Sequence, residues 1–223
     1  MKIDVLTLYT EIYDVFKSGI IGKALDKKIF ELNVHNIREF SKDKHKRCDD
    51  YPFGGGAGMV MTPQPLHDAI TKIDPEHTAK RIYLSPKGKR FDQKTALSLS
   101  KEKHLMFING SYEGVDQRIL DMDVDMELSI GDYVLTSGDY ATIVIINAIS
   151  RYIKGVLGSD ESTKEESFSN GLLEYPQYTR PQKFMGLEVP EVLLSGNHAE
   201  IQKWRKQKSI EITKVKRPDL LEE

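Results

Sequence analysis

Three apolar stretches, each followed by a loop that contains glycine, constrain the fold of this chain more than any other feature of its sequence. Two of them, residues 81–84 and 105–108, flank residues 93–103, which Asp92 can cap as a helix. A strand, a helix and another strand in this order are typical of a parallel sheet covered by helices. The pattern therefore predicts the α/β class.

The third stretch, residues 128–135, leads into a helix that Asp139 can cap and that should run to about residue 153. This helix is apolar on nearly all sides, so it must be buried, and a second subunit is one partner that could bury it. The loops after the three stretches should meet at the carboxyl edge of the sheet, where parallel sheets bind ligands.

Elements are also predicted outside this central region. Residues 3–8 predict a buried strand, and the alternation of apolar and polar residues over 30–35 predicts a half-buried one. Residues 159–167 are polar and charged without an apolar period, as in a flexible linker. Asn197, with Glu200 three residues later, predicts the start of a C-terminal helix.

The composition is that of a globular chain. Of its 223 residues, 39% are hydrophobic and 30% are charged, which is enough apolar content for a sizeable core. No apolar stretch approaches the roughly 20 residues that span a membrane, and no signal peptide is recognisable, so we expect a cytoplasmic protein without membrane contact. Cys48 is the single cysteine, and the six histidines do not show the spacing of zinc ligands.

Two local features leave alternatives open. Residues 53–59 contain four glycines, which indicate a turn with positive φ, a close approach of backbone to a ligand, or a plain flexible loop. This run lacks the lysine and hydroxyl residue of a nucleotide-binding loop. Residues 201–217 carry a net charge of +6 and the rest of the chain −8, which suits either a contact with phosphates or a solvated helix face.

Several long motifs, found in one order along the chain, resemble a single family. They are residues 49–61 (DDYPFGGGAGMVM), 129–135 (SIGDYVL), 171–181 (GLLEYPQYTRP), 189–198 (VPEVLLSGNH) and 217–221 (RPDLL). Through these motifs essentially the whole chain resembles the bacterial tRNA (guanine-37-N1)-methyltransferases of the SPOUT superfamily.

The resemblance implies a SPOUT-type parallel sheet with a deep trefoil knot, followed by a small C-terminal helical domain. Residues 1–158 would form the knotted domain that binds S-adenosylmethionine, residues 159–170 a flexible linker that carries the general base, and residues 171–223 a helical domain that binds tRNA. The resemblance further implies a homodimer with its active site at the subunit interface, acting on tRNA with guanine at position 37.

The resemblance also implies that the three loops after the strands hold S-adenosylmethionine. Glycines there permit close approach of the backbone to the ligand, and Glu113 would face the positively charged part of the donor. The residues expected to bind the donor are Leu84, Ser85, Pro86, Gly88, Gly110, Tyr112, Glu113, Gly114, Ser129, Ile130, Gly131, Asp132, Tyr133, Val134, Leu135 and Gly138.

Methylation of guanine at N1 needs a base that takes the N1 proton and a cation that stabilises the charge developing toward O6. By resemblance these are Glu166, where the family has an aspartate, and Arg151. The family's reaction depends on magnesium, although no cluster of carboxylates in this sequence marks an ion site. Contacts with tRNA are expected from basic side chains, namely Lys203, Arg205, Lys206, Lys208 and Arg180.

Four further positions around the expected donor site depart from the family pattern: Ser111, Ser137, Ala141 and Asn147. A side chain at Ser137, where the family has glycine, could narrow the donor site. The departures leave two alternatives open, a knotted tRNA-binding protein that has lost catalysis and a SPOUT methyltransferase that modifies a different RNA base.

Overall fold

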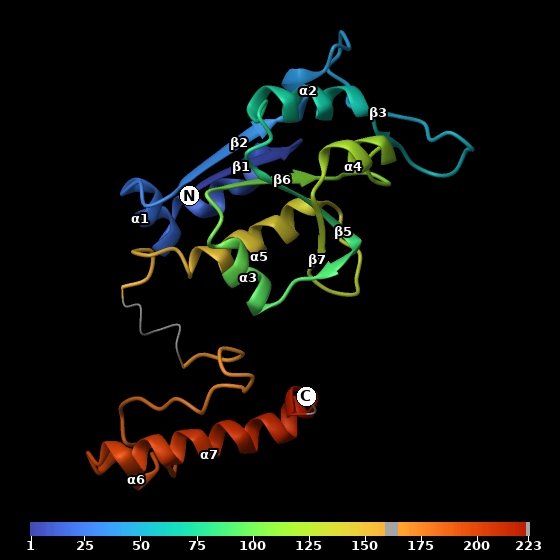
Figure 1. Ribbon diagram of the computed structural model, residues 1–223. Coiled ribbons are helices and arrows are strands. Elements are labelled where there is room, and N and C mark those ends of the chain that lie inside the picture. The colour runs from blue at the N-terminus through green and yellow to red at the C-terminus, as the bar shows by residue number, and fades with distance from the viewer. Residues whose placement is uncertain (159–164, 222–223) are drawn as a thin grey trace. The chain divides into compact units, whose positions relative to one another are not determined.

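The computed structural model describes residues 1–158 and 165–221 of the chain (Figure 1). The chain divides into two compact units, Met1–Gly158 and Ser159–Glu223, and each is described by itself. The first part of the predicted linker, residues 159–164, lies outside the described residues.

A five-stranded parallel sheet forms the centre of the first unit. In spatial order its strands are β2 (Glu31–Asn36), β1 (Lys2–Thr7), β6 (His104–Asn109), β5 (Lys80–Arg90) and β7 (Met126–Ser129). All neighbouring strands run parallel. The predicted α/β class with a parallel sheet is therefore confirmed.

Helices cover both faces of this sheet (Figure 1). One face carries the 3-10 helix η1 (Thr10–Lys17) together with α1 (Gly19–Asp26), α3 (Gln93–Leu99) and α5 (Gly138–Ser150). The other face carries η2 (Ile37–Phe40), α2 (Pro63–Ile73) and α4 (Gln117–Asp123). A short antiparallel pair, β3 (Asp49–Asp50) and β4 (Val60–Met61), encloses the glycine-rich run.

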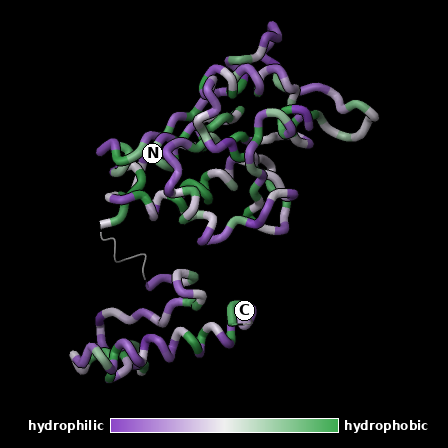
Figure 2. Tube along the Cα trace, viewed as in Figure 1, coloured by the Kyte–Doolittle hydropathy of each residue, from purple (hydrophilic) through white to green (hydrophobic). Residues whose placement is uncertain are grey.

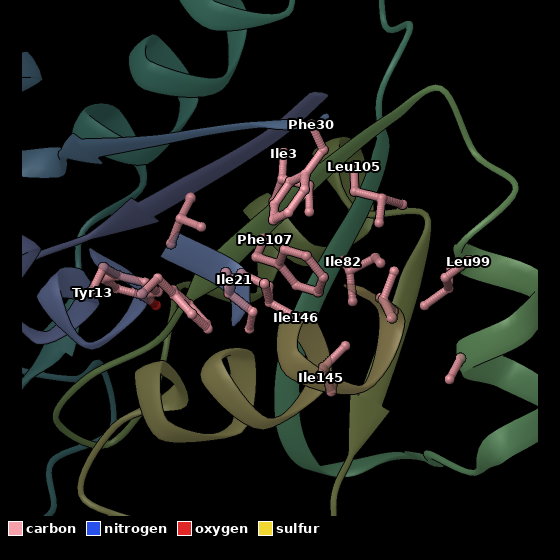
Figure 3. Close-up of a cluster of buried hydrophobic side chains, with 14 of the residues drawn as sticks. Ile3, Tyr13, Ile21, Phe30, Ile82, Leu99, Leu105, Phe107, Ile145 and Ile146 are labelled. Atoms are coloured by element: carbon pink, nitrogen blue, oxygen red, sulfur yellow. The ribbon is translucent and has the colours of Figure 1, made fainter. Parts of the chain in front are cut away.

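Alternating residues of the strands supply two separate hydrophobic cores. Ile3 and Val5 of β1 belong to the core on the α5 side, whereas Leu6 belongs to the core on the α2 side. Phe107 and Ile145 pack with Ile3 in the first of these cores, and all three are fully buried (Figure 3). Burying a side chain of this size contributes roughly 1.5–3 kcal/mol to folding.

The strand expected to end at residue 84 continues further. Leu84 and Lys89 of β5 both lie opposite Leu128 of β7, so residues 85–88 form an irregularity inside the strand rather than a loop after it. Gly88 is required there, because a Cβ at this position would lie 2.4 Å from the backbone nitrogen of Leu128.

Three other predicted elements are shorter in the structure. The predicted strand over 128–135 is wrong beyond Ser129, because the amide of Tyr133 donates to the carbonyl of Gly131 at 3.0 Å and closes a turn. The helix predicted over 93–103 ends at Leu99, where hydrogen bonds between residues three apart tighten the last turn. The helix predicted to reach residue 153 ends at Ser150.

The predicted burial of α5 is incomplete within the single chain. Ile145, Ile146 and Ile149 are fully buried, whereas Tyr140 and Val144 are 49% and 50% exposed. These two side chains lie four residues apart and so form one apolar stripe on the helix surface.

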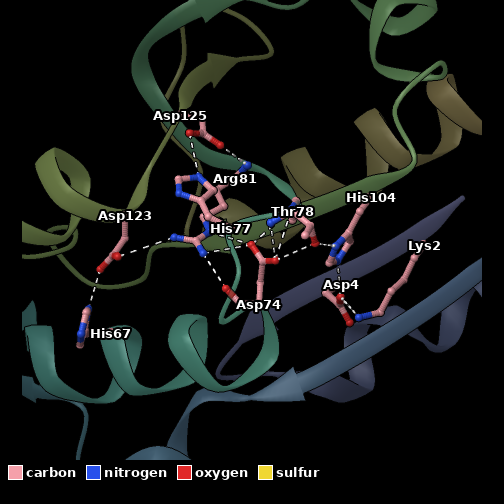
Figure 4. Close-up of polar contacts among 11 residues, drawn as sticks. Lys2, Asp4, His67, Asp74, His77, Thr78, Arg81, His104, Asp123 and Asp125 are labelled. Atoms are coloured by element: carbon pink, nitrogen blue, oxygen red, sulfur yellow. Dashed lines mark hydrogen bonds and ion pairs between the residues drawn. The ribbon is translucent and has the colours of Figure 1, made fainter.

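A buried carboxylate, that of Asp4, connects three strands of the sheet, and Figure 4 shows its contacts with Lys2 and His104. Asp4 Oδ1 of β1 lies 2.8 Å from His35 Nε2 of β2, and its Oδ2 lies 2.6 Å from His104 Nε2 of β6. Lys2 Nζ contacts the same Oδ2 at 2.8 Å. Burial alone would raise the pKa of Asp4, but these contacts outweigh burial and hold the pKa well below its usual range.

The second unit contains the helices α6 (Glu191–Leu194), α7 (His198–Lys216) and η4 (Pro218–Leu221), and the hairpin of β8 (Lys183–Phe184) and β9 (Leu187–Glu188). The predicted start of α7 is confirmed, since the side chain of Asn197 accepts from the amide of Glu200 at 3.3 Å. Hydrophilic residues predominate along α7 (Figure 2), and its buried side chains are Ser209 and Thr213.

Within residues 1–158 and 165–221, no helix combines the length and the apolar character that are needed to cross a bilayer.

Candidate functional site

A cavity of about 380 Å³ lies at the carboxyl ends of β6 and β7, beside the irregular part of β5. Its walls come from the irregular part of β5, the loop after β6 and the loop between β7 and α5. A volume of this size falls within the range of small-molecule sites. The three segments that the strand pattern predicted to meet at one edge of the sheet do meet there, although one of them, residues 85–88, lies inside β5 and is not a loop.

Nearly all residues expected to bind the donor line this cavity, and two do not. Gly88 packs against the backbone of β7 instead, and Asp132 is exposed beside the cavity wall. The residues brought together are Leu84, Ser85, Pro86, Gly110, Tyr112, Glu113, Gly114, Ser129, Ile130, Gly131, Tyr133, Val134, Leu135 and Gly138.

Tyr83 begins the first of the three loops expected to hold the donor but is not among the residues expected to bind it, and its side chain also lines the cavity. A Cβ at Gly110 would lie 2.6 Å from the Tyr83 hydroxyl, so this position excludes any side chain. Burial, together with the charge of Glu127, raises the pKa of Tyr83 to about 12, so its phenol stays protonated at neutral pH. The alternation of residues along β5 could have revealed a side chain on this face, but not its contact with a loop of β6.

The glycine-rich run borders the same site. Gly54, Gly55 and Gly56 have φ values of 87°, 79° and 126°, which side chains disfavour. At Gly58, with φ of 80°, a Cβ would lie 2.5 Å from Glu113 Oε1. Of the three readings left open, the structure therefore shows positive φ, and the close approach that it shows is to Glu113 of the cavity wall.

Ser137, rather than Asp139, caps α5. Its hydroxyl accepts from the amide of Asp139 at 3.4 Å. The prediction for Asp139 is wrong because its carboxylate turns inward, where Oδ1 accepts from the Tyr13 hydroxyl at 2.9 Å and from Asn109 Nδ2 at 3.0 Å. Asn109 in turn accepts from the Thr142 hydroxyl at 2.6 Å. Among the described residues, no group hydrogen-bonds to Asp139 Oδ2.

Of the four residues around the donor site that depart from the family pattern, three line the cavity and one does not. Ser111 and Ser137 pair in a short antiparallel bridge, and the amide of Gly138 donates to the carbonyl of Gly110 at 3.0 Å. These contacts join two walls of the cavity. Ala141 lines the cavity, and Asn147 is exposed on α5.

The two residues expected to carry out the chemistry belong to different units. Arg151 is half-buried and caps the carboxyl end of α5. Glu166 lies in a turn of the second unit, where its carbonyl accepts from the amide of Ser169 at 3.2 Å.

The basic residues expected to contact tRNA differ in their surroundings. Lys203 and Lys206 on α7 and Arg180 before it are exposed. Lys208 Nζ forms an ion pair with Glu211 at 2.6 Å, and Arg205 is half-buried against other side chains of the second unit. The exposed three are therefore the side chains best placed to contact phosphates.

Metal ligands are not grouped in the described parts of the chain: no three His, Cys, Asp or Glu side chains there are arranged to hold an ion. The cavity, in contrast, fits S-adenosylmethionine. Its walls combine apolar side chains with backbone at glycines, and Glu113 supplies a carboxylate for a cationic ligand.

Comparison with known proteins agrees with these features. The family model described as "tRNA (Guanine-1)-methyltransferase TrmD" matches residues 1–223. A tRNA (guanine-N(1)-)-methyltransferase of Clostridium novyi is 56% identical over 223 residues, which cover 100% of this chain and 92% of the relative. Proteins with the same name are 53% identical in Clostridium tetani, covering 98% of this chain and 91% of the relative, and 53% identical in Clostridium perfringens, covering 100% and 94%.

The family predicted from the motifs is thereby confirmed, and with it the class of enzyme. Methyltransferases of this family use S-adenosylmethionine in general. The chain belongs to the tRNA (guanine-1)-methyltransferase TrmD family.

Proposed function

We propose that this chain transfers the methyl group of S-adenosylmethionine to N1 of guanine 37 in tRNA, next to the anticodon. The observation that carries the proposal is the match to one family of tRNA methyltransferases over the full length of the chain. The cavity at the carboxyl edge of the sheet supports it, since it gathers the residues that the resemblance assigns to the donor.

In this proposal the cavity residues bind and orient the donor. Ile130 and Leu135 offer apolar walls, Gly110 and Gly138 let the backbone approach, and Glu113 balances positive charge. When bound, S-adenosylmethionine supplies an electrophilic methyl group on a positively charged sulfur. The protein's contribution is to hold that group still and to exclude water from it.

Glu166 and Arg151 are proposed for the two remaining tasks. Glu166 takes the proton from guanine N1, and Arg151 stabilises the negative charge that develops toward O6. Guanine 37 must leave the stack of the anticodon loop to expose its N1. Lys203, Lys206 and Arg180 are exposed and would contact the phosphates. The magnesium dependence implied by the resemblance stays a prediction.

We also propose a homodimer with its active site at the subunit interface. The apolar stripe of Tyr140 and Val144 on α5 supports this, since exposed apolar stripes of this kind are typical of interfaces. Sedimentation at micromolar concentration should give twice the mass of the chain. A monomer that methylates tRNA at full rate would contradict the proposal.

The decisive experiment measures transfer of labelled methyl from S-adenosylmethionine to an unmodified tRNA transcript with guanine at position 37, beside the same transcript with adenine there. Reactions with and without magnesium chloride test the metal dependence. Label in the guanine transcript alone is expected. Binding of tRNA without any label would favour the protein that has lost catalysis, and label in both transcripts would favour a different target base.

The assignment of roles is tested by two substitutions. Glu166→Gln should abolish turnover and leave the affinity for S-adenosylmethionine unchanged, because an amide cannot take the N1 proton. Arg151→Ala should lower the single-turnover rate by about 10²- to 10³-fold with little change in tRNA affinity. Full activity in either variant would contradict the role given to that residue.

A further inference from the structure

Three side chains of the second unit form a cluster directly beside Glu166, the proposed general base. The hydroxyl of Tyr175 donates to Glu165 Oε2 at 3.0 Å, and Arg205 Nη1 of α7 lies 3.6 Å from the same oxygen. The guanidinium of Arg205 lies over the ring of Tyr175, 4.7 Å from its centroid. A hydroxyl and a guanidinium thus hold one carboxylate, while the aromatic ring orients the guanidinium.

Arg205 differs from the other basic side chains near it on α7. Its side chain is 32% exposed, whereas Lys203 and Lys206 are largely exposed to solvent. The Nε of Arg205 is buried and has no hydrogen-bond partner among the described residues. A half-buried side chain whose Nε is buried is oriented toward its own unit and is less available as a surface cation than the exposed lysines.

The turn that follows Glu165 is attached to α7 at two further points. The amide of Leu173 donates to the hydroxyl of the fully buried Thr213 at 2.9 Å. The guanidinium of Arg217 lies 5.8 Å from the centroid of the Phe168 ring. Together with Arg205, these contacts attach residues 165–173 to α7 from its middle to Arg217, the residue that follows its last turn.

The turn is also closed by its own hydrogen bonds. The amide of Glu174 donates to the hydroxyl of Ser167 at 3.0 Å, and the amide of Phe168 donates to the carbonyl of Leu172 at 2.8 Å. Glu166 therefore lies in a turn that backbone and side-chain hydrogen bonds close.

We propose that Glu165, Tyr175 and Arg205 are positioning residues that fix the backbone from which Glu166 reaches the guanine. The proposal rests on the proposed function, in which Glu166 takes the N1 proton. Because the Cα atoms of adjacent residues are only about 3.8 Å apart, holding the side chain of Glu165 restricts where Glu166 can lie. A displacement of about 1 Å in a reacting group costs roughly 10²-fold in rate.

This proposal changes the role first expected for Arg205. A residue that contacts tRNA phosphates contributes to affinity and to its salt dependence. A residue that acts through Glu165 contributes to the rate at saturating tRNA and leaves affinity alone. The two roles therefore predict opposite divisions between KM and kcat.

The test compares Arg205→Lys, which keeps the charge but loses the planar group over Tyr175, with Tyr175→Phe, which removes one hydroxyl. Both variants should lower the methyl-transfer rate at saturating tRNA by about 10- to 100-fold. Their tRNA dissociation constants and salt slopes should stay within about two-fold of the original chain. Gln207→Ala, an exposed change on the same helix, serves as the matched control and should leave rate and affinity unchanged.

Weaker tRNA binding with an unchanged saturated rate in Arg205→Lys would overturn the proposal and return Arg205 to phosphate contact. Unchanged rates in both variants would overturn it as well. If Arg205→Lys unfolds the second unit, as judged by circular dichroism, Tyr175→Phe decides the matter alone. Glu166→Gln distinguishes the role of Glu166 from the positioning proposal. An active Glu166→Gln variant refutes Glu166 as the general base. An inactive Glu166→Gln variant together with a normal rate in Tyr175→Phe refutes only the positioning.

Discussion

Asp139 connects three elements of the first unit, namely η1, β6 and α5. Its Oδ1 receives hydrogen bonds from Tyr13 of η1 and Asn109 of β6, while its backbone lies in the first turn of α5. A negative charge there is favoured by the helix dipole. Burial raises the pKa of Tyr13, and the charge of Asp139 raises it further, so Tyr13 stays a neutral donor.

Replacing Tyr13 by phenylalanine should lower the free energy of unfolding by about 1–3 kcal/mol, because it removes the two buried hydrogen bonds that the hydroxyl makes with Asp139 and Asn109. Urea unfolding followed by circular dichroism measures this loss. Tyr51→Phe is the control, since Tyr51 is 79% exposed and its hydroxyl should contribute less than about 0.5 kcal/mol. Equal stability of the two variants would show that the buried hydroxyl contributes nothing.

At the scale of elements, the short-range signals in the sequence were sufficient for β1, β2, β6, the first part of β5 and the start of α7. Apolar runs marked β1, β5 and β6, and Asn197 marked the start of α7, because these signals depend on neighbouring residues. The irregularity in β5 was not predictable, since Gly88 is needed for its contact with Leu128 in another strand. The inward turn of Asp139 likewise depends on Tyr13, which is distant in sequence.

The cap of α5 gives a prediction at this scale. Ser137→Ala should lower the free energy of unfolding by about 0.5–1 kcal/mol, because the first turn loses its side-chain acceptor. Ser137→Gly, which introduces the residue of the family pattern, should lower the free energy of unfolding by only about a few tenths of a kcal/mol. Thermal unfolding of the two variants checks the order. An alanine variant more stable than the glycine variant would contradict the capping role.

At the scale of the whole molecule, the parallel sheet and the family were predicted and are confirmed. The strand pattern predicted the place of the cavity, whereas Arg151 and Glu166 were predictable only by resemblance, because no spacing along the chain connects them. The trefoil knot, the homodimer and the roles of single site residues stay predictions. A knot depends on how loops pass one another, and hydrophobic periodicity carries no information on that.

The Asp4 cluster predicts how stability depends on pH. The pKa of Asp4 is lower in the folded than in the unfolded chain. Its contribution to stability is therefore present above the unfolded pKa of about 3.9 and is lost as pH falls below that value. Asp4→Asn should therefore be less stable near pH 7 and should flatten the acid limb of a urea-midpoint curve. Asp14→Asn, at an exposed ion pair with Lys17, should leave that limb unchanged. An identical limb in Asp4→Asn would contradict this assignment.

The exposed lysines of α7 predict how tRNA binding depends on salt. Lys206→Ala should weaken binding and reduce the slope of log K against log salt by about 0.7–0.9, the value for one lost phosphate contact. Lys208→Ala should change the slope less, because Lys208 is already paired with Glu211. Filter binding at several salt concentrations measures both, and an unchanged slope in Lys206→Ala would favour a solvated helix face.

The position of β1 in the sheet has a consequence for biosynthesis. β1 leaves the ribosome well before β6, yet one of its edges pairs with β6, so that Lys2 lies opposite His104. Pairing between residues so far apart in the chain is slow, because the entropy of closing the loop opposes it. Until β6 is synthesised, an apolar strand edge stays open to other nascent chains. The yield of soluble enzyme should therefore depend on translation speed through the segment before β6, and on chaperones that cover β1 meanwhile.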